Sequence, residues 1–195
     1  VNNTGGTLKA GAGTTLTLSG SLTNFSAGTL TGGTYNVLGT MRLPTTSDIV
    51  TNAATIILDG AGSNLYNAPT GTTDALANFA TNAAAGSFTI QNGRNFTQSG
   101  AFSNAGTLTV GSGSTLTLSG SLANFSAGTL TGGTYNVLGT MRLPTTSDIV
   151  TNAATIILDG AGSNLYNAPT GTTDALANFA TNAAAGSFTI QNGRN

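Results

Sequence analysis

The sequence predicts an all-β fold, a parallel β-helix (β-solenoid) of about eight coils. Three features support this fold class: the chain repeats itself at a long period, a shorter theme recurs within each repeat, and short runs of alternating residues are separated by glycine-rich corners. Coils stacked at ~4.8 Å would form a rod on the order of 38 Å long.

The long repeat has a period of 100 residues. Residues 15–95 match residues 115–195 at every position except Thr23, which Ala123 replaces. Nine of the ten differences between residues 1–95 and 101–195 fall within the first fourteen positions. Such self-similarity is the sequence signature of repeat architectures. We therefore expect one continuous solenoid over 1–195, with one copy in 1–100 and a second in 101–195, inside a longer array.

A shorter theme divides each copy into four coils. It begins at residues 22, 49, 76, 102, 122, 149 and 176, and Asn3 supplies a truncated eighth start. The starts are 20 to 27 residues apart, which is typical of solenoid repeats.

Each coil contains short runs in which apolar and polar residues alternate, the pattern of β-strands. One set of runs is 29–31, 55–58, 87–90 and 107–110, and the second is 15–18, 34–37, 64–66 and 95–97. Glycine-rich corners at 32–33, 60–62 and 92–93 separate them. We expect a stack of Leu30, Ile56, Phe88 and Leu108 in the interior. The rest of the interior is predicted to be Leu16, Leu18, Val37, Leu58, Leu65, Ile90 and Phe96.

One segment has a helical pattern. Between Thr73 and Ala83 the apolar residues fall at i, i+3, i+4 and i+7, with Thr73 as a candidate N-cap. The pattern favours a turn or two of helix at 73–83 and again at 173–183. The alternative keeps Leu76 to Phe79 extended, in register with Leu22 to Phe25.

The composition excludes several classes of chemistry. The chain has five basic and six acidic residues, a net charge of −1, and no Cys, His, Trp or Glu. Thiolate nucleophiles, imidazole bases, disulfides and His/Cys metal sites are therefore absent from the sequence. The charge is too small and dispersed to indicate nucleic acid as a partner, and no apolar stretch is long enough for membrane insertion. We expect a protein that is not an enzyme.

The six acidic residues are predicted to be turn and cap residues rather than catalytic, cofactor-binding or metal-binding groups. They are Asp48, Asp59 and Asp74, with their copies Asp148, Asp159 and Asp174. Each lies beside a Ser, Thr or Gly corner. The turn at Asp59 is similar to calcium-binding β-roll turns, but one carboxylate is too few for a Ca²⁺ cage. Arg42 is expected to form a surface ion pair with Asp48.

Repeated polar residues predict two surface or corner features. Asn24, Asn52, Asn82 and Asn104 recur at one place in the theme, so they could stack as an amide ladder that joins adjacent coils. Thr-x-Thr runs could form hydroxyl rows of the kind expected in an ice-binding solenoid, but Thr55-Ile-Ile and Ser87-Phe-Thr interrupt them.

The unit Asn104-Ala-Gly-Thr-Leu-Thr-Val-Gly and the low charge resemble the repeat regions of large exported bacterial adhesins, the filamentous-haemagglutinin and autotransporter-passenger type. The resemblance implies a right-handed β-helix at the cell surface or outside the cell. It also implies a structural stalk or spacer role, with adhesion to a host or matrix glycan or protein as a further expectation.

Two other functions compete with this one. The alternative is a carbohydrate-binding or polysaccharide-cleaving β-helix, and a weaker candidate is an ice-binding solenoid. The expected partners are neighbouring repeats of the same chain, and strand edges at the ends of the solenoid indicate end-to-end self-association.

Overall fold

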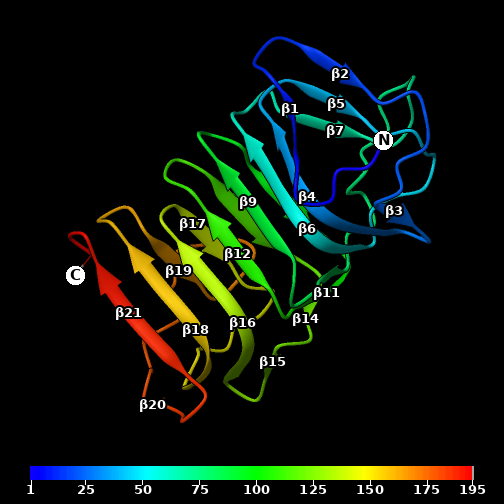
Figure 1. Cartoon of the computed structure of the whole chain (residues 1–195). Helices are drawn as coiled ribbons and strands as arrows, with labels where there is room; N and C mark the ends of the chain where they lie inside the picture. The colour runs from blue at the N-terminus through cyan, green and yellow to red at the C-terminus, as the bar shows by residue number, and fades with distance from the viewer. Residues whose placement is uncertain (195) are drawn as a thin grey trace.

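The computed structural model describes residues 1–194, and its strands stack in parallel as a β-solenoid (Figure 1). The predicted fold class is confirmed. Seven successive parallel pairings join eight rungs of the main sheet, and the two termini lie at opposite ends of the stack. The rungs are β1 (Thr7–Ala10), β4 (Thr29–Val37), β6 (Thr51–Asp59), β9 (Ser87–Gln91), β12 (Thr107–Val110), β16 (Thr129–Val137), β18 (Thr151–Asp159) and β21 (Ser187–Gln191).

A second, interrupted sheet faces the first. Its strands are β2 (Thr15–Thr17), β5 (Thr40–Arg42) and β7 (Asn64–Tyr66), then β10 (Phe96–Gln98), β13 (Thr115–Leu118), β17 (Thr140–Arg142) and β19 (Asn164–Tyr166). Shorter strands complete the coils: β8 (Thr81–Asn82), β11 (Ala101–Asn104), β14 (Ser121–Leu122) and β20 (Thr181–Asn182). Two more, β3 (Phe25–Ser26) and β15 (Phe125–Ser126), fold back antiparallel onto β4 and β16.

The hydrophobic core lies between the two sheets, in columns that follow the rung register. One column is Leu8, Tyr35, Ile56, Phe88, Leu108, Tyr135, Ile156 and Phe188. The next is Ala10, Val37, Leu58, Ile90, Val110, Val137, Leu158 and Ile190. Apart from Leu16, which is half-buried, every side chain predicted for the interior is buried. Burying one such aliphatic or aromatic side chain contributes about 1.5–3 kcal/mol.

The predicted stack is wrong at one position. Leu30 is fully buried, but it pairs with Asn52, and Tyr35 is the residue that aligns with Ile56. The register shifts between Thr31 and Thr34, where Gly32 and Gly33 insert a bulge into β4. The glycine pair therefore lies within a strand and does not end one.

The predicted helix at 73–83 is also wrong, as is the extended alternative for Leu76 to Phe79. Residues 75–78 form a turn, in which the Phe79 N–H donates to the Leu76 carbonyl at 3.1 Å, and β8 follows directly. The Ala75 N–H donates to Leu65 and the Ala80 N–H to Val50, at 2.9 Å each. Because the Ala80 N–H bonds to Val50, it cannot form the i→i−4 bond to Leu76 that a helix would require. The copy at 173–183 has the same turn.

Candidate functional site

The predicted asparagine ladder is present for three of its four residues, where Asn52 of β6 aligns with Asn82 of β8 and Asn104 of β11. The Asn52 Nδ2 donates to Asn82 Oδ1 at 3.0 Å, and the Asn82 Nδ2 donates to Asn104 Oδ1 at 2.9 Å. All three side chains are fully buried. In the second copy, Asn152 donates to Asn182 at 2.8 Å. Each amide is thus bonded to the coil next to it.

The ladder also satisfies backbone carbonyls of the neighbouring rung. Asn52 donates to Ser87 O at 3.2 Å, Asn82 to Thr107 O at 3.0 Å and Asn104 to Thr134 O at 3.2 Å. Buried polar groups are stable only when they are paired in this way. The ladder therefore ties consecutive coils together through side chains as well as through the sheet.

The ladder is interrupted at Leu30 and Leu130, which are the residues that pair with Asn52 and Asn152 on the preceding rungs. Asn24 does not stack on another amide there, because its Oδ1 instead accepts the backbone N–H of Asn3 at 2.6 Å. Asn3 also donates to Thr34 O, as Asn104 does to Thr134 O. The sequence analysis used Asn3 as a theme start but did not place it in the ladder, because Asn3 lies four residues before Thr7 whereas Asn104 lies three residues before Thr107.

The Gly32-Gly33 bulge makes room for this amide. Gly33 has φ +68°, and a Cβ there would lie 2.0 Å from the Asn3 carbonyl oxygen and 2.6 Å from its Nδ2. A Cβ at Gly133 would likewise lie 2.4 Å from the Asn104 Nδ2. Only glycine fits this close approach in the left-handed region.

The acidic residues are held singly by amide donors or by backbone. Asp48 accepts from Asn67 and, at 2.6 Å, from Asn78, while Asp59 accepts from Gln91 at 3.0 Å and Asn92 at 2.7 Å. Within residues 1–194, no group of three or more acidic residues could hold a metal ion. Asp48 lies in the connection between β5 and β6, and Asp59 is the last residue of β6, directly before the Gly60 turn.

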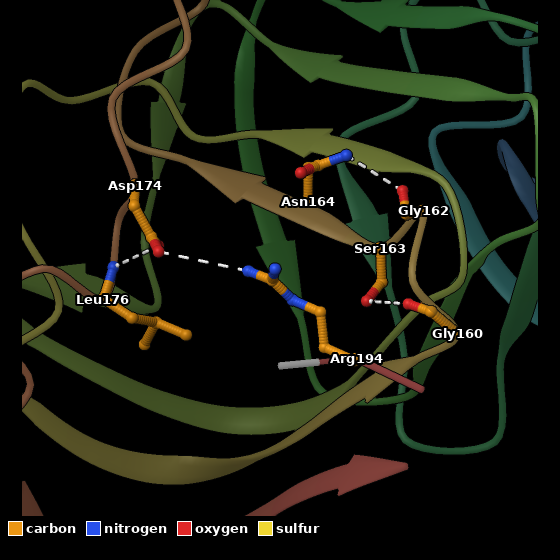
Figure 2. A network of polar contacts seen from close by, with 7 residues as sticks. All are labelled: Gly160, Gly162, Ser163, Asn164, Asp174, Leu176 and Arg194. Atoms are coloured by element: carbon orange, nitrogen blue, oxygen red, sulfur yellow. Dashed lines mark hydrogen bonds and ion pairs between the residues drawn. The ribbon is translucent and has the colours of Figure 1, made fainter. Parts of the chain in front are cut away.

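The third acid of each copy caps a turn. Asp74 Oδ1 accepts the Leu76 N–H at 2.8 Å, and Asp174 does the same for Leu176 at 2.9 Å. Figure 2 shows Arg194 extending toward Asp174, with 4.0 Å between the closest nitrogen and oxygen. This partly exposed ion pair is a weak contact.

The expected ion pair of Arg42 with Asp48 is not formed. The Arg42 guanidinium lies 5.2 Å from the centre of the Tyr66 ring and donates to the Gly71 carbonyl. Asp48 is already bonded to the two asparagine amides. Arg142 and Tyr166 repeat the arrangement at 5.1 Å.

One outward-facing hydroxyl column runs the whole length of the main sheet. It consists of Thr7, Thr34, Thr55, Ser87, Thr107, Thr134, Thr155 and Ser187. The adjacent column is mixed, because Lys9, Asn36, Ile57, Asn136 and Ile157 interrupt its threonines. A two-column threonine array is therefore broken at Ile57, as the sequence predicts, but the Ser87-Phe-Thr run does not interrupt it, because Ser87 and Thr89 supply a hydroxyl to each column. The sequence did not show the continuous column, since the bulge brings Thr34, and not Thr31, into it.

Neither a protein-family model nor a curated protein nor a solved structure matches this chain. In the described part of the chain, no helix is long and apolar enough to span a membrane.

Proposed function

We propose that this chain is a structural spacer in the stalk of an exported bacterial surface or secreted protein, and that it catalyses no reaction. The observation that carries the proposal is the junction between the two copies. β12 of the second copy pairs in parallel with β9 of the first and with β16 of its own copy. The β12–β16 pairing has the same register as β1–β4, residue for residue. A further copy can therefore be added without a new kind of interface.

A spacer built in this way lengthens by a fixed step. Each copy contributes four rungs, so each added copy should extend the rod by about 19 Å. The asparagine amides support rigidity, because amide–amide hydrogen bonds join neighbouring coils at three of the seven steps between rungs. Low charge and singly held carboxylates fit a role without acid–base chemistry.

Small-angle scattering on proteins with two, three and four copies tests the spacer role. The longest dimension should rise by about 19 Å per copy, with a cross-section that stays constant. A longest dimension that does not increase with copy number, or scattering that fits flexibly linked globular domains, would contradict the proposal.

Two further measurements test the location and the lack of catalysis. Antibody labelling of intact cells that express the full-length protein should detect this segment at the surface, and labelling only after lysis would contradict export. Neutral and uronic-acid polysaccharides should stay uncleaved by the purified chain. Cleavage that disappears in Asp59→Ala would overturn the non-catalytic role.

A further inference from the structure

The corners that follow β9 and β21 contain the two Asn-Gly pairs of the chain, Asn92-Gly93 and Asn192-Gly193. Both asparagines are exposed and have a left-handed backbone, with φ +54° and +52°, a conformation that asparagine tolerates better than most residues. An asparagine followed by glycine is also the pair in which a backbone nitrogen most easily attacks a side-chain amide, because the glycine has no Cβ to block the approach. Each corner is therefore a candidate site of deamidation.

Deamidation of such a pair takes two steps. The glycine nitrogen loses its proton to hydroxide and forms a bond to the asparagine Cγ, the Cγ–Nδ2 bond breaks, and ammonia leaves with a proton from water, so that a succinimide ring remains. Water then opens the ring at either carbonyl and gives aspartate or isoaspartate. Because the glycine nitrogen must leave any hydrogen bond that it makes before it can react, such a bond slows the reaction.

In the first copy, the next coil holds the reacting nitrogen. The Gly93 N–H donates to Ser114 Oγ at 3.1 Å, and Ser114 is only 2% exposed. The Thr115 N–H donates to Asn95 Oδ1 at 2.8 Å and joins the same two turns. Movement of Gly93 toward the Asn92 side chain therefore requires the corner to open against both contacts.

The second copy has the same turn without these contacts. β21 is the outermost rung of the stack (Figure 1), and within residues 1–194 no group accepts the Gly193 N–H. The contact of the asparagine side chain is the same in both copies, since Asn192 Nδ2 donates to Asp159 Oδ1 at 2.7 Å and Asn92 Nδ2 donates to Asp59 Oδ1 at 2.7 Å. The two sites differ in what holds the glycine nitrogen.

The Asp-Gly pairs at 59–60 and 159–160 could form the same ring, but their glycine nitrogens are held in both copies. The Gly60 N–H donates to the backbone carbonyl of Gln91 at 2.9 Å, and the equivalent bond of Gly160 is 3.0 Å long. The structure therefore selects the Asn-Gly pairs.

We propose that Asn192 is a site of spontaneous deamidation, and that Asn92 is protected because Ser114 of the next coil holds the Gly93 nitrogen. The deamidation rate of an Asn-Gly corner then reports whether a further coil is stacked on it. This chemistry goes beyond the spacer role and does not depend on it.

The modification changes the contact with Asp159. Hydrogen bonds from Asn192 and, second, from Gln191 hold the pKa of Asp159 below its usual value. An aspartate at position 192 cannot donate this bond at neutral pH and adds a negative charge beside Asp159, so the pKa of Asp159 should rise. Because Asp159 pairs with Gln191 of β21, the modification weakens the contact between β18 and the outermost rung.

Incubation of the whole chain in mildly alkaline buffer, followed by mass spectrometry, measures both rates. Cleavage before aspartate separates the sites, since fragment 74–147 contains Asn92 and fragment 174–195 contains Asn192. A fragment that carries OH in place of NH2, or that is cut at 92 or 192, counts as deamidated. We expect Asn192 to react at least about tenfold faster, the factor that loss of one or two hydrogen bonds gives. Equal rates, or a faster reaction at Asn92, would overturn the proposal.

Ser114→Ala removes the acceptor of the Gly93 N–H. It should speed deamidation of Asn92 toward the rate of Asn192 and leave Asn192 unchanged. Ser114→Thr is the matched control, because it keeps the hydroxyl and copies Thr14, which occupies the equivalent corner of the first copy. An Asn92 that stays slow in Ser114→Ala, or that reacts equally fast in both variants, would overturn the role of Ser114.

A chain in which residues 96–195 are repeated after Asn195 tests the effect of stacking directly. Its two internal Asn-Gly fragments have the same sequence, and both should react at the slow rate of Asn92, because a coil is now stacked on Gly193. Rapid deamidation of half of this fragment, in a protein that scattering shows to be one continuous rod, would overturn the proposal. A third copy that does not stack would contradict the spacer role instead.

Discussion

Replacing Asn82 by alanine should remove the central step of the ladder. The side chain makes three well-formed contacts: it donates to Asn104 Oδ1 at 2.9 Å and Thr107 O at 3.0 Å, and it accepts from Asn52 at 3.0 Å. Each hydrogen bond contributes about 0.5–1.5 kcal/mol, and buried groups left without partners cost more. We expect Asn82→Ala to lower the free energy of unfolding by about 3–5 kcal/mol.

Asn182→Ala is the matched control, because the surrounding sequence is the same in the second copy. Asn82 is fully buried, whereas Asn182 is exposed and is bonded only to Asn152 and the Gly186 carbonyl. Its loss should cost about 1 kcal/mol or less, since water can replace the missing partners.

Guanidinium unfolding followed by far-ultraviolet circular dichroism measures both changes. A loss below about 1 kcal/mol for Asn82→Ala, or an equal loss for the two variants, would refute the ladder as a stabilising element.

Four further outcomes are expected. Gly33→Ala should lower the free energy of unfolding by roughly 3 kcal/mol or more, since its Cβ would meet Asn3 at a left-handed φ. Gly60→Ala, with φ +88° and open space around the Cβ, should lower it by about 1–2 kcal/mol. Thermal melting of the two variants measures the difference. Leu130→Asp should cost more than about 4 kcal/mol, because it buries an unpaired charge, and a variant that melts like the parent would disprove the assigned register. Burial raises the pKa of Tyr135 above its ordinary 10.0, so the unfolded chain loses this proton first. Stability present below pH 10 should therefore fall at higher pH, and Tyr135→Phe should reduce that fall in alkaline melting curves. β21 repeats the sequence of β9, whose outer edge pairs with β12, so we propose that two chains associate end to end. In sedimentation the average mass should rise with protein concentration, and it should rise less for Ile190→Lys. A monomer at every concentration would count against this association.

The sequence by itself determined the fold class, the coil spacing and most of the core. Alternation in runs such as 55–58 and 87–90 specifies which side chains face inward, because successive residues of a strand point to opposite faces. Repetition of the theme also aligned Asn52, Asn82 and Asn104, whose ladder the structure confirms. Both signals are local or follow directly from the repeat, so a single sequence contains them.

The tertiary structure decided which residues become neighbours across coils. Two extra glycines in β4 place Tyr35, not Leu30, above Ile56. The turn at 75–78 does not continue as a helix, because the Ala80 N–H that follows it bonds to Val50 and not to Leu76. Gln98 attracts no notice in the sequence, and only its pairing with Leu118 shows that a polar side chain occupies a core position. Alternation specifies the face of a residue, whereas the register between coils depends on bulges and connection lengths that become defined only when the coils stack.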